Sequence, residues 1–228
     1  MLIRTKLALN LAVQLALVGL LALALQQLHA SYEALETTQR RQIEGLQLVN
    51  EVRQSSDELT QMARLFVVTR EPRYAEYFRE IARIRDGVSP RPPDYDAIYW
   101  DLVRAKAAEH GSAGRRQALL DRLRLSGFRS SEFALLDEAK LRSDALIKLE
   151  DMAMGLIDSR RSSSNAALSD EEWRQSLGLM HGETYMNSKA DIMLPLRQFS
   201  ALVETRLSGE REAAQEGVRR SLLAVLVA

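Results

Sequence analysis

The sequence contains no cysteine and little proline, glycine or histidine. Its 228 residues include five prolines, eleven glycines and three histidines. Without cysteine the chain has no disulfide and no thiolate metal ligand, and its histidines lack the i, i+4 spacing of a zinc-binding helix. Scarce proline and glycine, with abundant Leu, Ala, Glu, Gln and Arg, favour helices. We therefore expect an all-α protein without a metal site or a cofactor.

The chain also lacks an excess of charge of either sign. Lys plus Arg and Asp plus Glu both number 31. Proteins that bind nucleic acid use a basic surface to neutralise phosphates, so we expect no nucleic-acid partner. No phosphate-binding loop, dinucleotide-binding motif or G-x-S-x-G motif occurs in the sequence. No enzymatic activity is predicted for this segment, and the activity of a full-length protein that contains it stays open.

One long hydrophobic run occurs near the N-terminus. Residues 7–25, LALNLAVQLALVGLLALAL, span about 28 Å as a helix, close to the ~30 Å hydrocarbon core of a bilayer. Arg4 and Lys6 precede the run, so the positive-inside rule places the N-terminus in the cytoplasm. A retained anchor is favoured over a cleaved signal peptide, because the run is long and residues 28–30 (LHA) form a poor cleavage site.

The last residues, SLLAVLVA, are apolar as well. We expect them to begin a second membrane helix, although Arg219 and Arg220 just before them would need to snorkel on the outer side. Three segments follow from this layout. Residues 1–29 form a cytoplasmic stub and the first transmembrane helix, 30–220 form a periplasmic domain, and 221–228 form the truncated start of the second transmembrane helix. Two membrane helices around an outer domain are typical of bacterial transmembrane receptors of the inner membrane.

Apolar residues at three- and four-residue spacings predict a series of amphipathic helices in the domain. We expect a long helix through Val68, a second from Pro72 to Arg85 that stops at Gly87, and a third from about Asp94 to Glu109. A short helix should end at Ser126 and Gly127, and the next should run from a Ser130 or Ser131 cap to about Ser159. Further helices should follow from Ser169, with a kink at Pro195 in the last. Ser169 and Glu172 form a capping box, and Leu168 and Trp173 form a hydrophobic staple. Together the helices predict an antiparallel, four-helix-bundle-like domain, with residues 71–128 as a helical insertion far from the membrane.

Three stretches of the chain resemble the periplasmic sensor regions of bacterial receptors. They are LTQMARLFVVTREPRYAEYFREIARIRDGVSPRPPDYDAIYWD (59–101), GFRSSEFALLDEAKLRSDALIKLEDMAM (127–154) and HGETYMNSKADIMLPLRQF (181–199). In that family the region lies between two membrane helices, ahead of a HAMP linker. The output module is a histidine kinase, a chemotaxis domain, a nucleotide cyclase or a phosphatase. The resemblance implies a sensor input and leaves the output open.

Aromatic and basic side chains gather in the expected insertion. They are Arg73, Tyr74, Tyr77, Phe78, Arg85, Arg91, Tyr95, Tyr99 and Trp100. In one interpretation the aromatic residues form the core of the insertion and the arginines surround it. In the other, arginine holds the carboxylate of a small anionic or amphipathic ligand while tyrosine and tryptophan orient the rest. His181, Tyr185 and Lys189 recur every four residues on one face of the last helix, which serves either as a second source of ligand contacts or as a structural face.

These observations predict a sensor that detects a small ligand or a periplasmic partner protein. Binding would displace the last helix relative to the first, and the membrane helices would carry this displacement to a HAMP-linked module in the cytoplasm. Long helices and zero net charge favour a homodimer with parallel subunits. The alternative is a membrane-anchored helical adaptor or tether without a signalling output.

Overall fold

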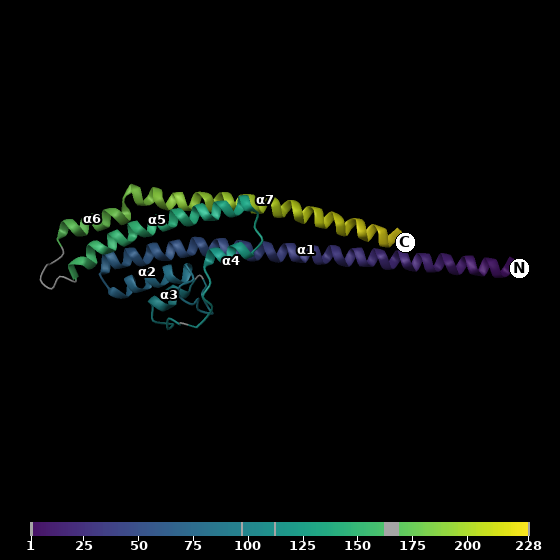
Figure 1. Ribbon diagram of the computed structural model, residues 1–228, viewed down its shortest axis with the longest axis horizontal. Coiled ribbons are helices and arrows are strands. Elements are labelled where there is room, and N and C mark those ends of the chain that lie inside the picture. Colours follow the sequence, from purple (N-terminus) through teal and green to yellow (C-terminus); the bar gives the residue numbers. More distant parts are fainter. Residues whose placement is uncertain (1, 97, 112, 162–168, 228) are drawn as a thin grey trace. The chain divides into compact units, whose positions relative to one another are not determined.

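The computed structural model describes residues 2–96, 98–111, 113–161 and 169–227, and the regular elements in these ranges are all helices (Figure 1). The helices are α1 (Leu2–Thr69), α2 (Pro72–Arg85), α3 (Tyr99–Arg104), α4 (Leu119–Leu125), α5 (Ser130–Arg161), α6 (Asp170–His181) and α7 (Glu183–Val227). The all-α class predicted from the sequence is confirmed. The chain divides into two compact units, Met1–Ile43 with Val203–Ala228, and Glu44–Leu202.

The first unit consists of the N-terminal part of α1 and the C-terminal part of α7. Leucines of the N-terminal apolar run face outward, and Leu7, Leu11 and Leu15 are 73%, 58% and 64% exposed, whereas Leu207 of α7 is buried. Within the described part of the chain, α1 is the one helix long and apolar enough to cross a membrane. In the C-terminal tail, Leu222 and Leu223 are exposed, whereas the side chains of residues 224–228, like that of Arg4, lie outside the described residues. The membrane crossings themselves stay predictions.

A tight turn joins α1 to α2, as the Glu71-Pro72 pair predicts. Arg70 adopts a left-handed conformation with φ 61° and donates its backbone N–H to the carbonyl of Phe66 at 2.7 Å, which ends α1. Glu71 is extended and Pro72 begins α2, because proline needs no intrahelical partner for its nitrogen. At the other end, Gly87 with φ 73° stops α2. Both predicted limits of α2 are confirmed.

Two other predicted limits are wrong. The helix expected from Asp94 to Glu109 covers only Tyr99–Arg104, because Asp96 accepts a bond from the N–H of Ile98 (3.1 Å) in a turn before it and Lys106, with φ 57°, ends it. The helix after Gly127 begins at Ser130 and ends at Arg161, close to its predicted limits. Ser130 is its first helical residue, so it is not the residue before the helix as a cap would be. Glu132 instead accepts the backbone N–H of Arg129 at 2.8 Å.

Helices α6 and α7 are separate elements with a break at Gly182. The capping box of Ser169 and Glu172 at the start of α6 is confirmed, whereas Leu168 of the expected staple lies outside the described residues, as does the loop 162–168. Gly182 is extended, with φ −74° and ψ 169°, so α7 begins only at Glu183. Pro195 lies inside α7, and the kink there stays a prediction.

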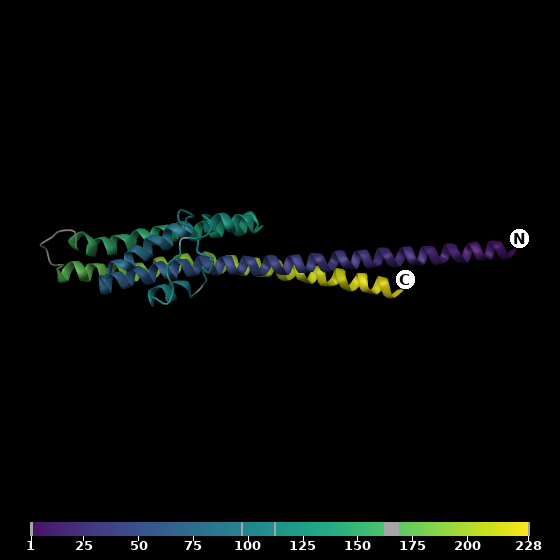
Figure 2. The ribbon, with the colours of Figure 1, turned by 90° about the horizontal axis from the view of Figure 1, so that it is seen from below.

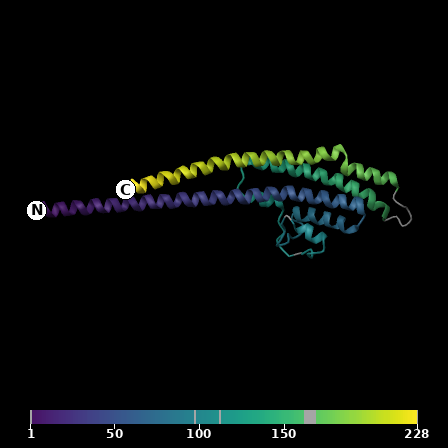
Figure 3. The ribbon, with the colours of Figure 1, turned by 180° about the vertical axis from the view of Figure 1, so that it is seen from behind.

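The second unit, Glu44–Leu202, has a continuous core between α1, α2, α5, α6 and α7. Met62 of α1, Ile81 of α2, Ala139 of α5, Met180 of α6 and Ile192 of α7 are all 0% exposed. The predicted apolar stripe of the last helix is thus buried within this unit, as are Leu196 and Phe199. Figure 2 and Figure 3 show these helices running alongside one another, with the short α3 outside α2.

Candidate functional site

The aromatic residues of segment 74–100 pack against each other. Trp100 is 1% exposed, and its ring centroid lies 5.3 Å from that of Tyr77 and 5.4 Å from that of Tyr99. Its indole N–H donates to the hydroxyl of Tyr95 at 2.9 Å. Tyr74, 8% exposed, packs edge to face with Tyr77, with ring centroids 6.5 Å apart. This arrangement fits the interpretation in which the aromatic residues form the core of the insertion.

Arg73 and Arg85 bind carboxylates of the chain itself. The Nε of Arg73 lies 2.5 Å from Glu71, and its Nη2 donates to the hydroxyl of Tyr74 at 2.9 Å. Arg85 is 8% exposed and donates to Asp144 of α5 at 2.6 Å, which ties α2 to α5. The two guanidinium groups therefore do not converge on a common ligand site.

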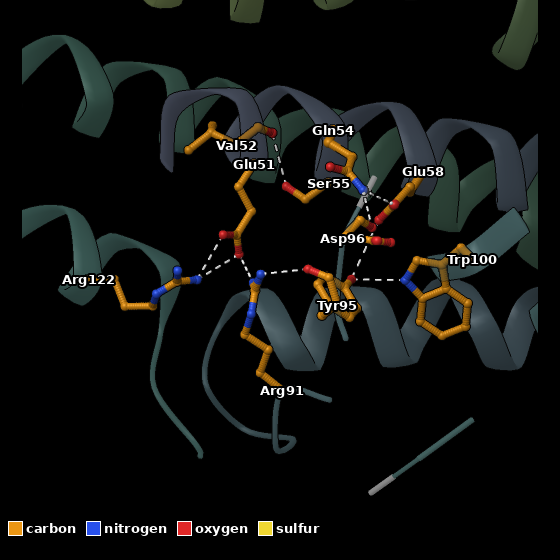
Figure 4. A network of polar contacts seen from close by, with 10 residues as sticks. All are labelled: Glu51, Val52, Gln54, Ser55, Glu58, Arg91, Tyr95, Asp96, Trp100 and Arg122. Carbon is orange, nitrogen blue, oxygen red and sulfur yellow. Dashed lines mark hydrogen bonds and ion pairs between the residues drawn. The ribbon is translucent and has the colours of Figure 1, made fainter. Parts of the chain in front are cut away.

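Arg91 lies in a polar network on α1, shown in Figure 4. Arg91 and Arg122 both form ion pairs with the carboxylate of Glu51. Arg122 donates to the two carboxylate oxygens at 2.9 and 2.8 Å. Arg91 also donates to the carbonyl of Tyr95 at 2.7 Å, and burial, followed by the nearby charge of Arg122, lowers the pKa of Arg91 to about 10. A groove of about 670 Å³ lies over this network. Because Glu51 already engages both arginines, the network fastens α4 and the loop before α3 to α1.

A buried carboxylate, Glu58, lies next to this network. Gln54 donates to it at 2.7 Å, and the hydroxyl of Tyr95 lies 3.5 Å from its second oxygen (Figure 4). The side chain is almost fully enclosed, and this burial raises the pKa of Glu58 to about 7. Burial likewise raises the pKa of Tyr95. Tyr95 also lines the groove over Glu51, whereas Glu58 does not line it.

His181, Tyr185 and Lys189 line one pocket, as the sequence spacing suggested. The prediction that they share one helix is wrong, because the extended Gly182 places His181 at the end of α6 and the other two on α7. The pocket, which we call the α1–α7 pocket, has a volume of about 520 Å³. Its lining residues are Asp57, Thr60, Gln61, Arg64, Leu65 and Val68 from α1, with His181, Tyr185, Met186 and Lys189.

The floor of the α1–α7 pocket is a buried hydrogen-bond network around Glu150 of α5. Tyr185 donates its hydroxyl to Glu150 at 2.6 Å, and Thr60 donates to the same oxygen at 3.1 Å. Glu150 and Tyr185 are each 1% exposed. Burial outweighs these hydrogen bonds and raises the pKa of Glu150 to about 7. Burial, followed by the charge of Glu150, also raises the pKa of Tyr185.

Three basic side chains surround the pocket. Lys189 donates to Ser56 at 2.8 Å and pairs with Asp57 at 2.9 Å. Arg64 lies over the ring of Tyr185, 5.0 Å from its centroid. Burial, followed by the charge of Arg64, lowers the pKa of His181. The pocket is therefore lined by two permanent cations, a histidine and the carboxylate of Asp57, and Glu150 lies buried beneath Thr60 and Tyr185.

The sequence reasoning missed Thr60, Arg64 and Glu150. A signal for Glu150 was present, because it falls one turn after Leu146 and before Ala153, on the apolar side of its helix. Thr60 likewise lies between Leu59 and Met62. An ionisable residue on an apolar stripe predicts a buried polar contact, although its partner on another helix cannot be read from spacing.

No protein-family model, curated protein or solved structure matches this chain. The resemblance to receptor sensor regions therefore stays a prediction, and the α1–α7 pocket is the site that carries the functional argument.

Proposed function

We propose that this chain is the extracytoplasmic sensor input of a bacterial transmembrane receptor, with a ligand site in the α1–α7 pocket. The helices of the domain form an antiparallel bundle, α1 anchors it in the inner membrane with its N-terminus in the cytoplasm, and α7 leads into a second span. The receptor is a homodimer and passes its signal to a HAMP-linked output. These statements extend the helical structure of the described residues, among which one helix is long and apolar enough to cross a membrane.

The location of the α1–α7 pocket supports this proposal. Its walls belong to α1, which carries the apolar run, and to α7, which leads to the apolar tail. Lys189 of α7 bonds to Ser56 and Asp57 of α1, so the contact between the two helices runs through the pocket itself. A ligand that binds these groups changes the contact between α1 and α7. Small shifts between packed helices are an established way to carry a signal along them.

The orientation is tested by labelling, for which a chain without cysteine gives a clean background. Single cysteines replace Asn187, which is exposed in the second unit, and Lys6, which is exposed before the apolar run. In spheroplasts, a membrane-impermeant maleimide should label Asn187→Cys at once and Lys6→Cys only after the membrane is opened. The reverse pattern, or labelling of neither variant before permeabilisation, contradicts an extracytoplasmic domain.

The signalling role is tested in a chimera. Residues 1–220 are joined to the second span, HAMP linker and kinase module of a reporter histidine kinase, and kinase output is measured at equal membrane abundance. Lys189→Ala removes the polar contacts that Lys189 makes with α1 and should change the basal output several-fold, whereas Asn187→Ala, on the same helix and outside the pocket, should not. If neither variant changes the output, the adaptor or tether is the better description.

A further inference from the structure

The cations of the α1–α7 pocket differ in how many of their hydrogen-bond donors are bound to groups of the chain itself. Lys189 is already bound to Asp57 and to the hydroxyls of Ser56 and Thr60, the latter at 3.2 Å. Arg64 lines the pocket and donates one Nη2 N–H to the carbonyl of Met180 at 3.0 Å. Its Nε is buried and closed to a ligand. A guanidinium presents five N–H donors, so the terminal nitrogens of Arg64 retain donors for an anion.

Arg64 is also held in place before any ligand arrives. Its guanidinium stacks over the ring of Tyr185, and that ring is fixed by the hydroxyl bond to Glu150 at 2.6 Å. A fixed donor loses little conformational entropy when it binds a carboxylate. This geometry favours one anionic group bound at a defined position.

Three side chains of the pocket lining are apolar. They are Leu65, Val68 and Met186, and Val68 and Met186 are 56% and 54% exposed. A volume of about 520 Å³ lies within the usual range for small-molecule sites. With one guanidinium that has spare donors, the pocket suits a monoanion with an apolar body better than a polyphosphate.

The buried network at the floor of the pocket couples anion binding to the protonation of Glu150. With Glu150 ionised, Tyr185 and Thr60 donate their hydroxyl protons to it and leave lone pairs for the pocket. An anion in the pocket repels the Glu150 carboxylate, from which a single hydroxyl separates it. A protonated Glu150 donates to Tyr185 instead, and the hydroxyl of Tyr185 becomes free to donate elsewhere in the network.

Other charged groups also face this floor. They are Lys189 on α7, Arg64 and Asp57 on α1, Asp151 beside Glu150 on α5, and His181 at the end of α6. Protonation of His181, Asp57 or Asp151 would also favour an anion. The test below separates these groups from Glu150, because uptake by any of them persists in Glu150→Gln.

We propose that the α1–α7 pocket binds a small amphipathic monocarboxylate, that Arg64 holds its carboxylate, and that Glu150 takes up a proton as it binds. This inference rests on the proposed sensor function and names the ligand class of its site.

The first test measures binding to the full chain in lipid nanodiscs by calorimetry and thermal shift. The probes are benzoate, phenylacetate, isovalerate and 4-methylvalerate, each with its neutral amide as the control. At least one carboxylate should bind and raise the melting temperature while its amide does not. Arg64→Met should weaken binding at least about tenfold, since charge-assisted hydrogen bonds are lost. Arg197→Met, which alters an exposed arginine of α7, should leave it unchanged. Binding of none of the acids, or equal binding of the amides, overturns the ligand class.

The second test counts protons by calorimetry at neutral pH in phosphate and in Tris, which differ in ionisation enthalpy. Glu150 has a pKa of about 7 and is therefore about half protonated at pH 7, so wild type and His181→Asn should take up as much as about half a proton per bound carboxylate, and Glu150→Gln should take up none. Uptake that persists in Glu150→Gln overturns the role of Glu150. Binding without a change of output in the chimera would refute the sensor function alone, while altered output without carboxylate binding would refute the ligand class alone.

Discussion

Replacement of Glu150 by glutamine should remove a large part of the pH dependence of stability. Burial raises the pKa of Glu150 from 4.5 to about 7, so the folded protein holds this proton more tightly than the unfolded chain. The resulting stabilisation is complete below the unfolded pKa and is lost as the pH rises through the folded pKa. Between pH 5 and pH 8 the loss of this contribution should lower the free energy of unfolding of the wild type by about 2.5 kcal/mol.

Urea unfolding provides the assay. The two tryptophans, Trp100 and Trp173, both lie in the second unit, so their fluorescence follows the part of the chain that contains Glu150. With an m-value of about 2 kcal/mol/M, the wild-type midpoint should fall by about 1 M more than that of Glu150→Gln between the two pH values. Glu58, whose pKa is raised in the same direction, titrates in both proteins and cancels in this comparison.

A parallel decline in the two proteins would refute this reasoning. It would mean that Glu150 binds its proton no more tightly in the folded state than in the unfolded one. The hydroxyls of Tyr185 and Thr60, together with Lys189, would then stabilise the charge as well as water does, and burial would not dominate.

Two further substitutions test the packing, each with a matched control and the same fluorescence assay. Arg85→Ala removes a nearly buried guanidinium that donates to Ser143 and Asp144, and because Asp144 keeps Lys140 at 2.6 Å the fold should lose only about 1–2 kcal/mol. Arg124→Ala, whose side chain is 55% exposed, should cost less than about 0.5 kcal/mol. Similar losses for both would contradict a structural role of the α2–α5 ion pair. Gly87→Ala places a Cβ 2.5 Å from backbone at φ 73° and should destabilise by more than about 1 kcal/mol. Gly155→Ala, with open space around it in α5, should stabilise by up to about 1 kcal/mol, and equal effects of the two glycine variants would refute the left-handed stop.

Local chemistry made several element limits predictable. Pro72 and Gly87 set the two ends of α2, and Ser169 with Glu172 set the start of α6. In each case the information lies within a few residues, because a missing N–H, a free φ or a capping hydroxyl acts on its own helix end. The limits of α3 were missed because Asp96 and Lys106 form turns that compete with helix only in the folded loop.

The residues of the candidate site were likewise predictable only where they lie close together in the sequence. The sequence placed His181, Tyr185 and Lys189 on a common spacing, and they do share a pocket, but it gave no reason to join them to Arg64 or Glu150. Those partners lie on α1 and α5, and they meet only after three helices have packed.

The sequence by itself determined that the chain is helical, where several of its helices stop, and that its N-terminal run is long enough to cross a bilayer. Periodicity, capping and hydropathy decide these features, and all three act over short distances along the chain. Only the tertiary structure decided that Arg73, Arg85 and Arg91 bind carboxylates of the chain itself, while Arg64 keeps donors free beside a buried Glu150. The physical reason is that charge pairing and burial depend on which helices are neighbours, and no local pattern specifies that.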